Sequence, residues 1–280
     1  MKIKLPYLFG TGLLIVLLGF PIFSEPANIA FSFLPETNFD ASTKCLLLQK
    51  NQEFKERYFI ELGLGVDFAL FSINDQFFFK GEYHQLTGMG RQDGVIIFDP
   101  RDASYHATAW IEYRFDNFDI QAGLEHPCYH EIDRHKKPPA YWNKIFTGIQ
   151  SKRPFQRPGN LYLQSFNDRL SWQARWGYFV GNNPEKNNSI CAKSITYTNE
   201  LTLAFNYTAY VWKNMAIMVN GQSLLGGMKE GTYWSQVFGA SVELHSKKFT
   251  GDFFINYNLD DVLWMLSRDR LLEVGIRIKK

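Results

Sequence analysis

The 280-residue sequence has few cysteines, little net charge and, beyond its N-terminus, no long apolar run. Its formal net charge of +2 provides no strong attraction for nucleic acid or an acidic partner, so no nucleic-acid partner is expected. None of the three cysteines closely follows the N-terminal apolar run, which argues against processing as a lipoprotein. No later apolar stretch reaches the about 18 residues of a membrane helix, and this excludes further membrane helices.

The N-terminus has the pattern of a secretory signal peptide. Lys2 and Lys4 precede an apolar run that includes residues 13–18, and the turn-forming or small residues Pro21 and Ser24 follow it. The run is too short to be a membrane anchor. We therefore expect residues 1–24 to be a signal peptide and the rest of the chain to be exported.

The exported part is rich in aromatic residues, and its apolar residues alternate with other residues. Aromatic residues make up 16% of the chain, with 25 Phe, 14 Tyr and 7 Trp. The most regular alternation places apolar side chains on even positions, at Tyr58, Ile60, Leu62, Leu64, Val66, Phe68 and Leu70. These features predict an all-β fold, an antiparallel transmembrane β-barrel of the bacterial outer membrane. The alternative is a secreted β-sandwich with an aromatic core.

The same alternation predicts roughly eleven strands, and since single-chain bacterial barrels have even counts, the expected number is about 12. We expect the barrel to occupy residues 56–280. Residues 25–55 are expected to be an N-terminal lead-in, either a periplasmic segment, a plug or the missing first strand. Residues 86–104, which contain three glycines and a proline, are predicted to be a long connection, and residues 151–167 receive no assignment.

Charged residues occupy the strand positions that alternate with the apolar ones. The predicted inward-facing residues are Glu61, Asp67, Glu82, Glu112, Arg114, Arg175, Glu200 and Glu243. They indicate a lumen filled by polar contacts rather than a wide pore. Short turns alternate with long connections along the chain, as expected when turns face the periplasm and loops face outward.

One predicted strand carries an unusual set of side chains on its apolar face. Within residues 117–133, the positions of one parity are apolar from Phe118 to Leu124, and the same parity then places three reactive side chains outward. These are His126, Cys128 and His130. From Phe118 to His126 the strand rises about 26 Å before tilt, so His126 is expected near the outer edge of the hydrocarbon band.

These side chains are suited to nucleophilic catalysis. Asn143 has the outward parity on the next predicted strand, where it could lie beside His126. A thiol, an imidazole and an amide can act as nucleophile, base and orienting group, and at this depth they would meet the ester carbonyls of outer-leaflet lipids. In the purely structural interpretation, Cys128 is a small apolar filler and the imidazoles cap the strand. A third interpretation is a metal site for Zn²⁺ or Cu²⁺ at His126, Cys128 and His130.

Four segments resemble the outer-membrane phospholipase A family. The family has His-x-Ser-Asn-Gly followed by Ser-Trp-Asn-Arg-Leu-Tyr, and this chain has His126-Pro-Cys-Tyr-His130 followed by Tyr141-Trp-Asn-Lys-Ile-Phe146. The segment Tyr178-Phe-Val-Gly-Asn-Asn-Pro184 is similar to the family's Tyr-Val-Val-Gly-Asn, and Arg101-Asp-Ala-Ser-Tyr105 is similar to its Arg-Glu-Thr-Asn-Tyr. The resemblance runs in order from about residue 56 to the C-terminus.

The resemblance implies a twelve-stranded barrel with its catalytic residues on the exterior and acyl-ester hydrolysis of membrane phospholipids as the activity. It makes His126 the general base, Cys128 the nucleophile in place of serine, and Asn143 the orienting amide. It also implies that Arg101 and Tyr105, together with His130, are substrate-binding residues, and that the protein can form a homodimer. The alternative function is a non-catalytic barrel, either structural or a narrow channel.

The chain departs from the family pattern near the catalytic residues. The family implies a calcium cofactor, but Glu131 and Pro139 occupy the places of its calcium-site Arg and Ser, so the calcium ligands do not match. The envelope is oxidising, and Cys45 and Cys191 are available as disulfide partners. A disulfide at Cys128 would remove the nucleophile.

Overall fold

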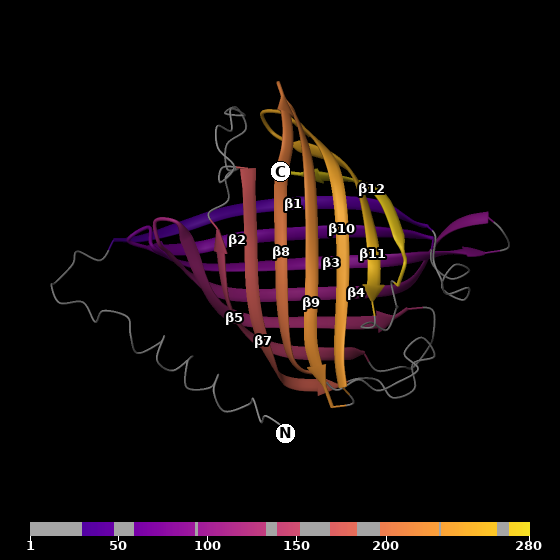
Figure 1. The fold of residues 1–280 in the computed structure, drawn as a ribbon, viewed down its shortest axis with the longest axis horizontal. Helices are drawn as coiled ribbons and strands as arrows, with labels where there is room; N and C mark the ends of the chain where they lie inside the picture. Colours follow the sequence, from indigo (N-terminus) through magenta and orange to yellow (C-terminus); the bar gives the residue numbers. More distant parts are fainter. Residues whose placement is uncertain are drawn as a thin grey trace.

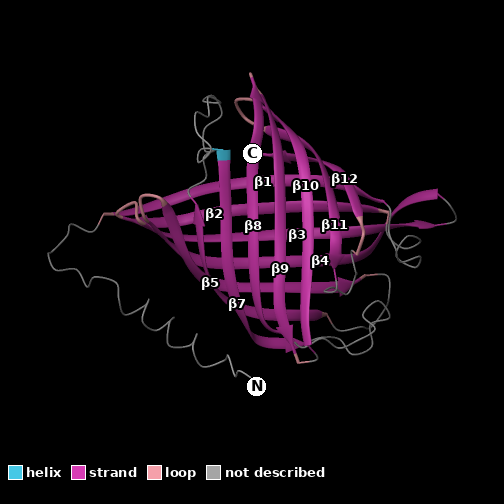
Figure 2. Ribbon diagram, viewed as in Figure 1, coloured by secondary structure: helices cyan, strands magenta, loops and turns pink. Residues whose placement is uncertain are grey.

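The computed structural model of the protein describes residues 30–47, 59–92, 95–132, 139–151, 169–183, 197–229, 231–261 and 269–280. These residues form a closed antiparallel barrel of twelve strands, in which each strand pairs with its sequence neighbours and β1 pairs with β12 (Figure 1). Almost every described residue outside the turns is in a strand (Figure 2). Among these residues we find no helix with the length and hydropathy needed to cross a bilayer. The predicted fold class and strand number are confirmed.

The strands are long and follow one another along the chain with no crossover. Their bounds are β1 Phe31–Leu47, β2 Ile60–Ile73, β3 Phe77–Gln92, β4 Val95–Arg114, β5 Phe118–Glu131, β6 Ala140–Ser151, β7 Leu170–Asn183, β8 Tyr197–Trp212, β9 Met215–Met228, β10 Gly231–His245, β11 Thr250–Asp261 and β12 Leu272–Lys279. The turn between β2 and β3 places Asn74 and Asp75 at φ angles of 53° and 52°, a left-handed conformation that Asn and Asp tolerate in tight turns.

The structure resolves two regions that the sequence left open or predicted differently, namely β1 and the connection between β3 and β4. The strand missing from the alternation is β1, which lies within residues 25–55 and closes the barrel between β2 and β12. The prediction of a long connection at residues 86–104 is wrong, because β3 continues to Gln92 and β4 begins at Val95. Register shifts near Met89 accommodate Gly88, Gly90 and Pro100 within the paired strands. The predicted signal peptide, residues 152–168 and Cys191 lie outside the described residues.

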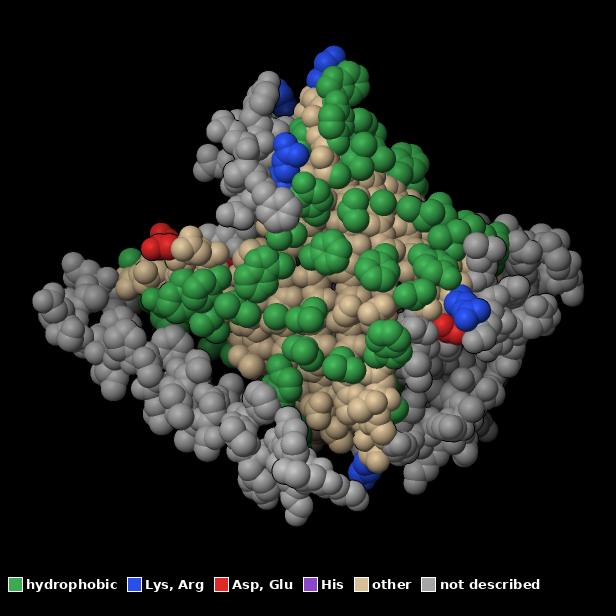
Figure 3. Space-filling model, in the orientation of Figure 1, with side chains coloured by type: hydrophobic (Ala, Val, Ile, Leu, Met, Phe, Trp, Pro, Cys, Tyr) green, Lys and Arg blue, Asp and Glu red, His purple; other side chains and the backbone are tan. Residues whose placement is uncertain are grey.

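The exterior of the barrel is apolar. Alternate residues of each strand face outward, and large apolar side chains among them are exposed, with Leu64 at 60% and Leu124 at 61%. The space-filling view shows apolar side chains spread over the visible barrel wall, whereas charged side chains appear toward its edges (Figure 3). An apolar outer wall around a polar interior is the pattern of a barrel that spans a lipid bilayer.

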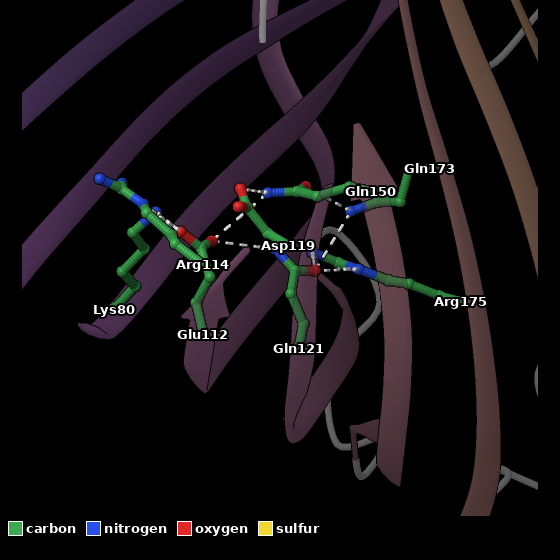
Figure 4. Close-up of polar contacts among 8 residues, drawn as sticks. All are labelled: Lys80, Glu112, Arg114, Asp119, Gln121, Gln150, Gln173 and Arg175. Carbon is green, nitrogen blue, oxygen red and sulfur yellow. Dashed lines mark hydrogen bonds and ion pairs between the residues drawn. The ribbon is translucent and has the colours of Figure 1, made fainter. Parts of the chain in front are cut away.

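The interior is filled by polar networks. In one of them, the carboxylate of Glu112 accepts hydrogen bonds from Lys80 at 2.6 Å and from Gln121 at 3.2 Å, and Arg175 donates to the amide oxygen of Gln121 at 3.2 Å (Figure 4). Figure 4 shows this network extending across neighbouring strands through Arg114, Asp119, Gln150 and Gln173. The prediction of a lumen filled by polar contacts therefore agrees with the structure.

A second, apolar cluster fills the lumen near one end of the barrel. We call the end at which β5 ends and β6 begins the rim end. The cluster, termed here the inner aromatic cluster, consists of Leu46, Tyr129, Ala140, Trp142, Phe179, Tyr197, Tyr233 and Leu271, all buried. The ring of Tyr197 lies 5.5 Å from that of Trp142 and 5.1 Å from that of Tyr233. These side chains come from strands on opposite sides of the barrel, so they obstruct the lumen at the rim end.

Candidate functional site

The candidate site lies on the outer face of β5 and β6 at the rim end. In β5, Gln121, Glu125 and Tyr129 are buried inward, whereas Leu124 and His126 are exposed. Cys128 and His130 share the outward parity and are partly exposed. The structure therefore places His126, Cys128 and His130 together on the apolar wall, as the alternation of the sequence predicted.

His126 and Asn143 are in direct contact across β5 and β6. The strand pairs on either side of them are Glu125 with Lys144 and Cys128 with Tyr141, so His126 lies opposite Asn143 in the same register. The Nδ1 atom of His126 lies 2.7 Å from Oδ1 of Asn143. With the amide oxygen accepting from Nδ1–H, the Nε2 atom of the ring is left as a proton acceptor. Asn143 can thus fix the tautomer that a general base requires.

The thiol of Cys128 contacts a different imidazole. Its Sγ atom lies 3.0 Å from Nε2 of His130, two residues further along β5. No hydrogen bond joins Cys128 to His126 within the part of the chain that the structure describes. Sequence parity could not separate these two partners, because His126 and His130 lie at equal distances along the strand on either side of Cys128. The thiol therefore has one imidazole within hydrogen-bond distance and a second one, held by Asn143, on its other side.

Tyrosines flank Cys128 on both neighbouring strands. Tyr105 of β4 and Tyr141 of β6 lie opposite Cys128 in the sheet. The ring of Tyr105 packs edge-on against His130 at 5.2 Å, and the ring of Tyr141 lies 5.6 Å from His126. Tyr105 was expected to be a site residue, whereas Tyr141, which begins the motif that contains Asn143, was not, although its parity with Asn143 could have identified it. Aromatic rings at this height resemble the interfacial girdle of membrane barrels.

The remaining predicted site residues are arranged differently. Arg101 lies at the same end of the barrel, where its carbonyl accepts a hydrogen bond from Ile132 N–H at 3.0 Å. The contacts described for Cys128 and His130 do not include it. Glu131 ends β5, and Pro139, which has no side-chain donor or acceptor, precedes β6. Calcium requires about six to eight oxygen ligands, and among the described side chains on this outer face the site residues offer nitrogen, sulfur and aromatic groups, which do not fit a calcium site.

The interior directly behind the site is charged and tightly paired. Lys144 follows Asn143 in β6 and faces inward, where its Nζ atom lies 2.7 Å from both Glu125 and Glu200. Tyr233 donates a hydrogen bond to Glu200 at 3.1 Å. These contacts link β5, β6, β8 and β10 across the lumen. Together with the inner aromatic cluster, they hold the wall that carries the outward-facing side chains.

Comparisons with known proteins identify the fold by structural similarity. No protein family and no curated protein matches this chain. Among solved structures, outer membrane phospholipase A from Escherichia coli is similar with a TM-score of 0.52 at 13% sequence identity, over 88% of this chain and 93% of that one. The chain has the fold of an outer-membrane β-barrel. The resemblance that the sequence motifs indicated is confirmed at the level of the fold.

Two further structures show how widely this architecture is shared. The outer membrane phospholipase dimer with bound calcium from Salmonella typhi has a TM-score of 0.51 at 13% identity, over 92% of this chain and 94% of that one. An outer membrane channel from Pseudomonas putida F1 has a TM-score of 0.50 at 8% identity, over 92% and 99%. Because enzymes and channels both have this fold, the function of the chain has to be argued from its own side chains.

Proposed function

We propose that this outer-membrane barrel hydrolyses acyl esters of membrane phospholipids with a Cys-His-Asn site on its lipid-facing rim. The observation that carries the proposal is the 2.7 Å contact between His126 and Asn143 on the outer wall, beside the outward-facing thiol of Cys128. An imidazole whose tautomer is fixed by an amide, next to a thiol, is the arrangement of a nucleophile with its base. With the rim end facing outward, as the proposal requires, the site would lie at the height of the ester carbonyls of outer-leaflet lipids.

In the proposed reaction, His126 takes the proton of Cys128 and the sulfur attacks the ester carbonyl carbon. The carbon–oxygen bond of the ester breaks, the acyl group stays on sulfur as a thioester, and His126 returns the proton to the leaving alcohol oxygen. Water then attacks the thioester, with His126 accepting one of its protons and returning it to the thiolate. The products are a fatty acid and a lysophospholipid. Proton transfer by a general base such as His126 contributes about 10²–10⁴-fold to the reaction rate.

His130 has a separate role in this proposal. Its contact with Cys128 at 3.0 Å holds the thiol in the resting state, and its ring packs nearly perpendicular to the ring of Tyr105. Rotation of the cysteine side chain would direct the sulfur toward His126 when a lipid binds. His130 and Tyr105 would then line the surface that receives the substrate, as the resemblance implies for both.

The partners of the proposed enzyme are the phospholipids of the outer membrane. The apolar outer wall of the barrel would present the site to lipid without a passage through the lumen. A homodimer is a further part of the proposal, supported by the dimeric structure of the Salmonella typhi phospholipase. Cross-linking of the purified protein with and without phospholipid would measure the dimer fraction.

The alternative is a barrel without catalysis. A metal at His126, Cys128 and His130 has no geometric support, because within the described residues they do not form a group whose potential ligand atoms all lie within 4.8 Å of one another. A channel is disfavoured by the inner aromatic cluster and the polar networks, which occupy the lumen. A purely structural role is thus the competing interpretation.

Fatty-acid release from phospholipid by the refolded wild type, His126→Ala and His130→Ala tests the proposal. We expect release by the wild type, a loss of about 10²-fold or more in His126→Ala, and a smaller loss in His130→Ala. No release by folded wild-type protein would leave only the non-catalytic barrel. Loss confined to His130→Ala would assign the base to the imidazole that the resting thiol contacts.

A further inference from the structure

A group of carboxylates in the lumen, away from the rim, surrounds a single imidazole. Asp67 of β2 lies opposite Glu82 of β3, and Gly65 lies between Asp40 of β1 and His84 of β3 in the sheet. Alternation directs all four polar side chains inward. The register of three strands therefore brings Asp40, Asp67, Glu82 and His84 together, although they are spread over 45 residues of sequence.

The distances within this group are too long for good hydrogen bonds. The Nε2 atom of His84 lies 3.5 Å from Asp67 and 3.8 Å from Glu82, whereas N–H···O hydrogen bonds are about 2.7–3.2 Å long. With bonds of about 2.0–2.2 Å, tetrahedral ligands of one Zn²⁺ ion lie about 3.4 Å apart. One potential ligand atom from each of Asp67, Glu82 and His84 lies within 4.8 Å of the other two. The spacing suits three ligands of one ion better than a hydrogen-bonded cluster.

The charge of this group also differs from that of the other interior clusters. Four other sets of interior carboxylates each face a cation: Glu61 and Glu273 face Lys44, Glu112 faces Lys80, Glu125 and Glu200 face Lys144, and Glu243 and Asp252 face Lys279. In the described chain, the ion pairs of Asp40, Asp67 and Glu82 all go to His84. The nearby Arg175 donates its hydrogen bonds to Gln121 instead. Three carboxylates thus face one imidazole, and Arg175 and His106 add positive charge near Glu82 without an ion pair to it in the described part of the chain.

The group forms beside a glycine and is partly exposed. A Cβ atom at Gly65 would collide with the side-chain ends of both Asp40 and His84, so a larger residue at this position would displace them from their present positions. The side chains of Asp67 and His84 are 48% and 35% exposed toward the lumen, which gives an ion a path to them. Asp40 lies beside the other ring nitrogen, Nδ1, at 3.7 Å, so a small side-chain rotation would bring its carboxylate within hydrogen-bond distance. A carboxylate on that side of a ligating imidazole orients the ring and selects its tautomer.

We propose that Asp67, Glu82 and His84 bind a divalent transition-metal cation in the lumen, with Asp40 orienting His84. One imidazole and two carboxylates suit Zn²⁺ and its first-row neighbours better than calcium or magnesium, which prefer sites made of oxygen alone. The ion joins β2 to β3 and, through Asp40, to β1, where the barrel closes. This site is independent of the proposed hydrolase site on the outer wall.

Zinc binding to the chelator-treated, refolded protein tests the proposal. We expect about one Zn²⁺ per chain in the wild type, and an affinity at least about tenfold lower in Asp67→Asn and His84→Gln. His245→Gln is the matched control, because this lumenal imidazole faces Glu243, which Lys279 neutralises. It should bind zinc like the wild type. Unchanged affinity in both Asp67→Asn and His84→Gln would overturn the proposal.

A second measurement distinguishes the lumen from the rim, and its main readout is made on the wild-type protein itself. Cobalt bound by the wild type should give the absorption bands of nitrogen and oxygen ligands, without the charge-transfer band of a thiolate. Cys128→Ser should retain the bound ion. A thiolate band, or loss of the ion in Cys128→Ser, would place the metal at the rim and contradict the proposed site.

Discussion

Inside the barrel, the Nζ atom of Lys144 lies 2.7 Å from a carboxylate oxygen of Glu125. Glu125 precedes His126 in β5, and Lys144 follows Asn143 in β6, so the ion pair lies directly beside the outward contact between His126 and Asn143. Because successive side chains of a strand face opposite sides, the pairing that joins the two charges inside also brings the imidazole and the amide together outside. The proposed catalytic geometry therefore depends on buried electrostatics as well as on the rim residues.

Removing the buried cation should destabilise the barrel. In Lys144→Met, Glu125 and Glu200 lose their shared cation, and we expect a loss of about 3 kcal/mol in the free energy of unfolding. Urea unfolding from phospholipid vesicles, followed by tryptophan fluorescence, would measure it. Lys279→Met is the control, because the side chain of Lys279 is 38% exposed and that of Lys144 only 9%, and its loss should be about 1 kcal/mol or less. Equal losses would contradict the role given to Lys144.

The side-chain oxygen of Asn143 should be required for full hydrolytic activity. Asn143→Ala removes the acceptor for Nδ1–H of His126, and we expect fatty-acid release to fall about tenfold or more. Asn143→Asp keeps an oxygen at the same place and should retain more activity than Asn143→Ala. Rates of fatty-acid release at saturating phospholipid, compared between folded variants, provide the test. Equal activity in the wild type and Asn143→Ala would remove Asn143 from the site.

The outer wall should tolerate a charge only near its edges. Leu124 lies near the middle of β5 and is 61% exposed, so Leu124→Arg should lower the free energy of unfolding by about 2–4 kcal/mol in a bilayer. Leu47 lies at the rim end of β1 and is the matched control position. Leu47→Arg should lower the free energy of unfolding by only about 0–1 kcal/mol. Unfolding in vesicles measures both values. A similar small cost at Leu124 would mean that this wall does not face lipid.

The obstructed lumen leads to a prediction about conductance. Because the inner aromatic cluster crosses the lumen, the wild-type barrel in a planar bilayer should conduct little or no ion current. Trp142→Ala combined with Tyr197→Ala removes two of its rings and should increase the conductance. A steady current through the wild type would instead support the narrow channel considered from the sequence.

Alternation along the strands was sufficient to predict the barrel and the outward group of His126, Cys128 and His130, because parity alone decides which side a residue faces. It also indicated Asn143 as the partner of His126. β1 was left open among several interpretations, because the segment Asp40–Lys44 is mostly small or polar and its alternation is weak. The connection predicted around Gly88 and Pro100 was wrong, since bulges can keep such residues within paired strands.

The specific side-chain contacts of the two sites could not be predicted from the sequence. The choice of His130 over His126 as the neighbour of the resting thiol depends on side-chain rotation, which parity does not specify. The group of Asp67, Glu82 and His84 depends on the register of β2 against β3. Register is set by the pairing of the whole barrel, so the inward parity of Asp67 and Glu82 alone did not indicate a shared site.

The most direct test of the central proposal compares two outward-facing cysteines at the rim end. Cys45 of β1 has no imidazole among its described contacts, whereas Cys128 lies beside two of them. Fatty-acid release from phospholipid vesicles should fall to background in Cys128→Ala and stay at the wild-type rate in Cys45→Ala. Equal release by the wild type and Cys128→Ala would show that the thiol on the outer wall is not the nucleophile.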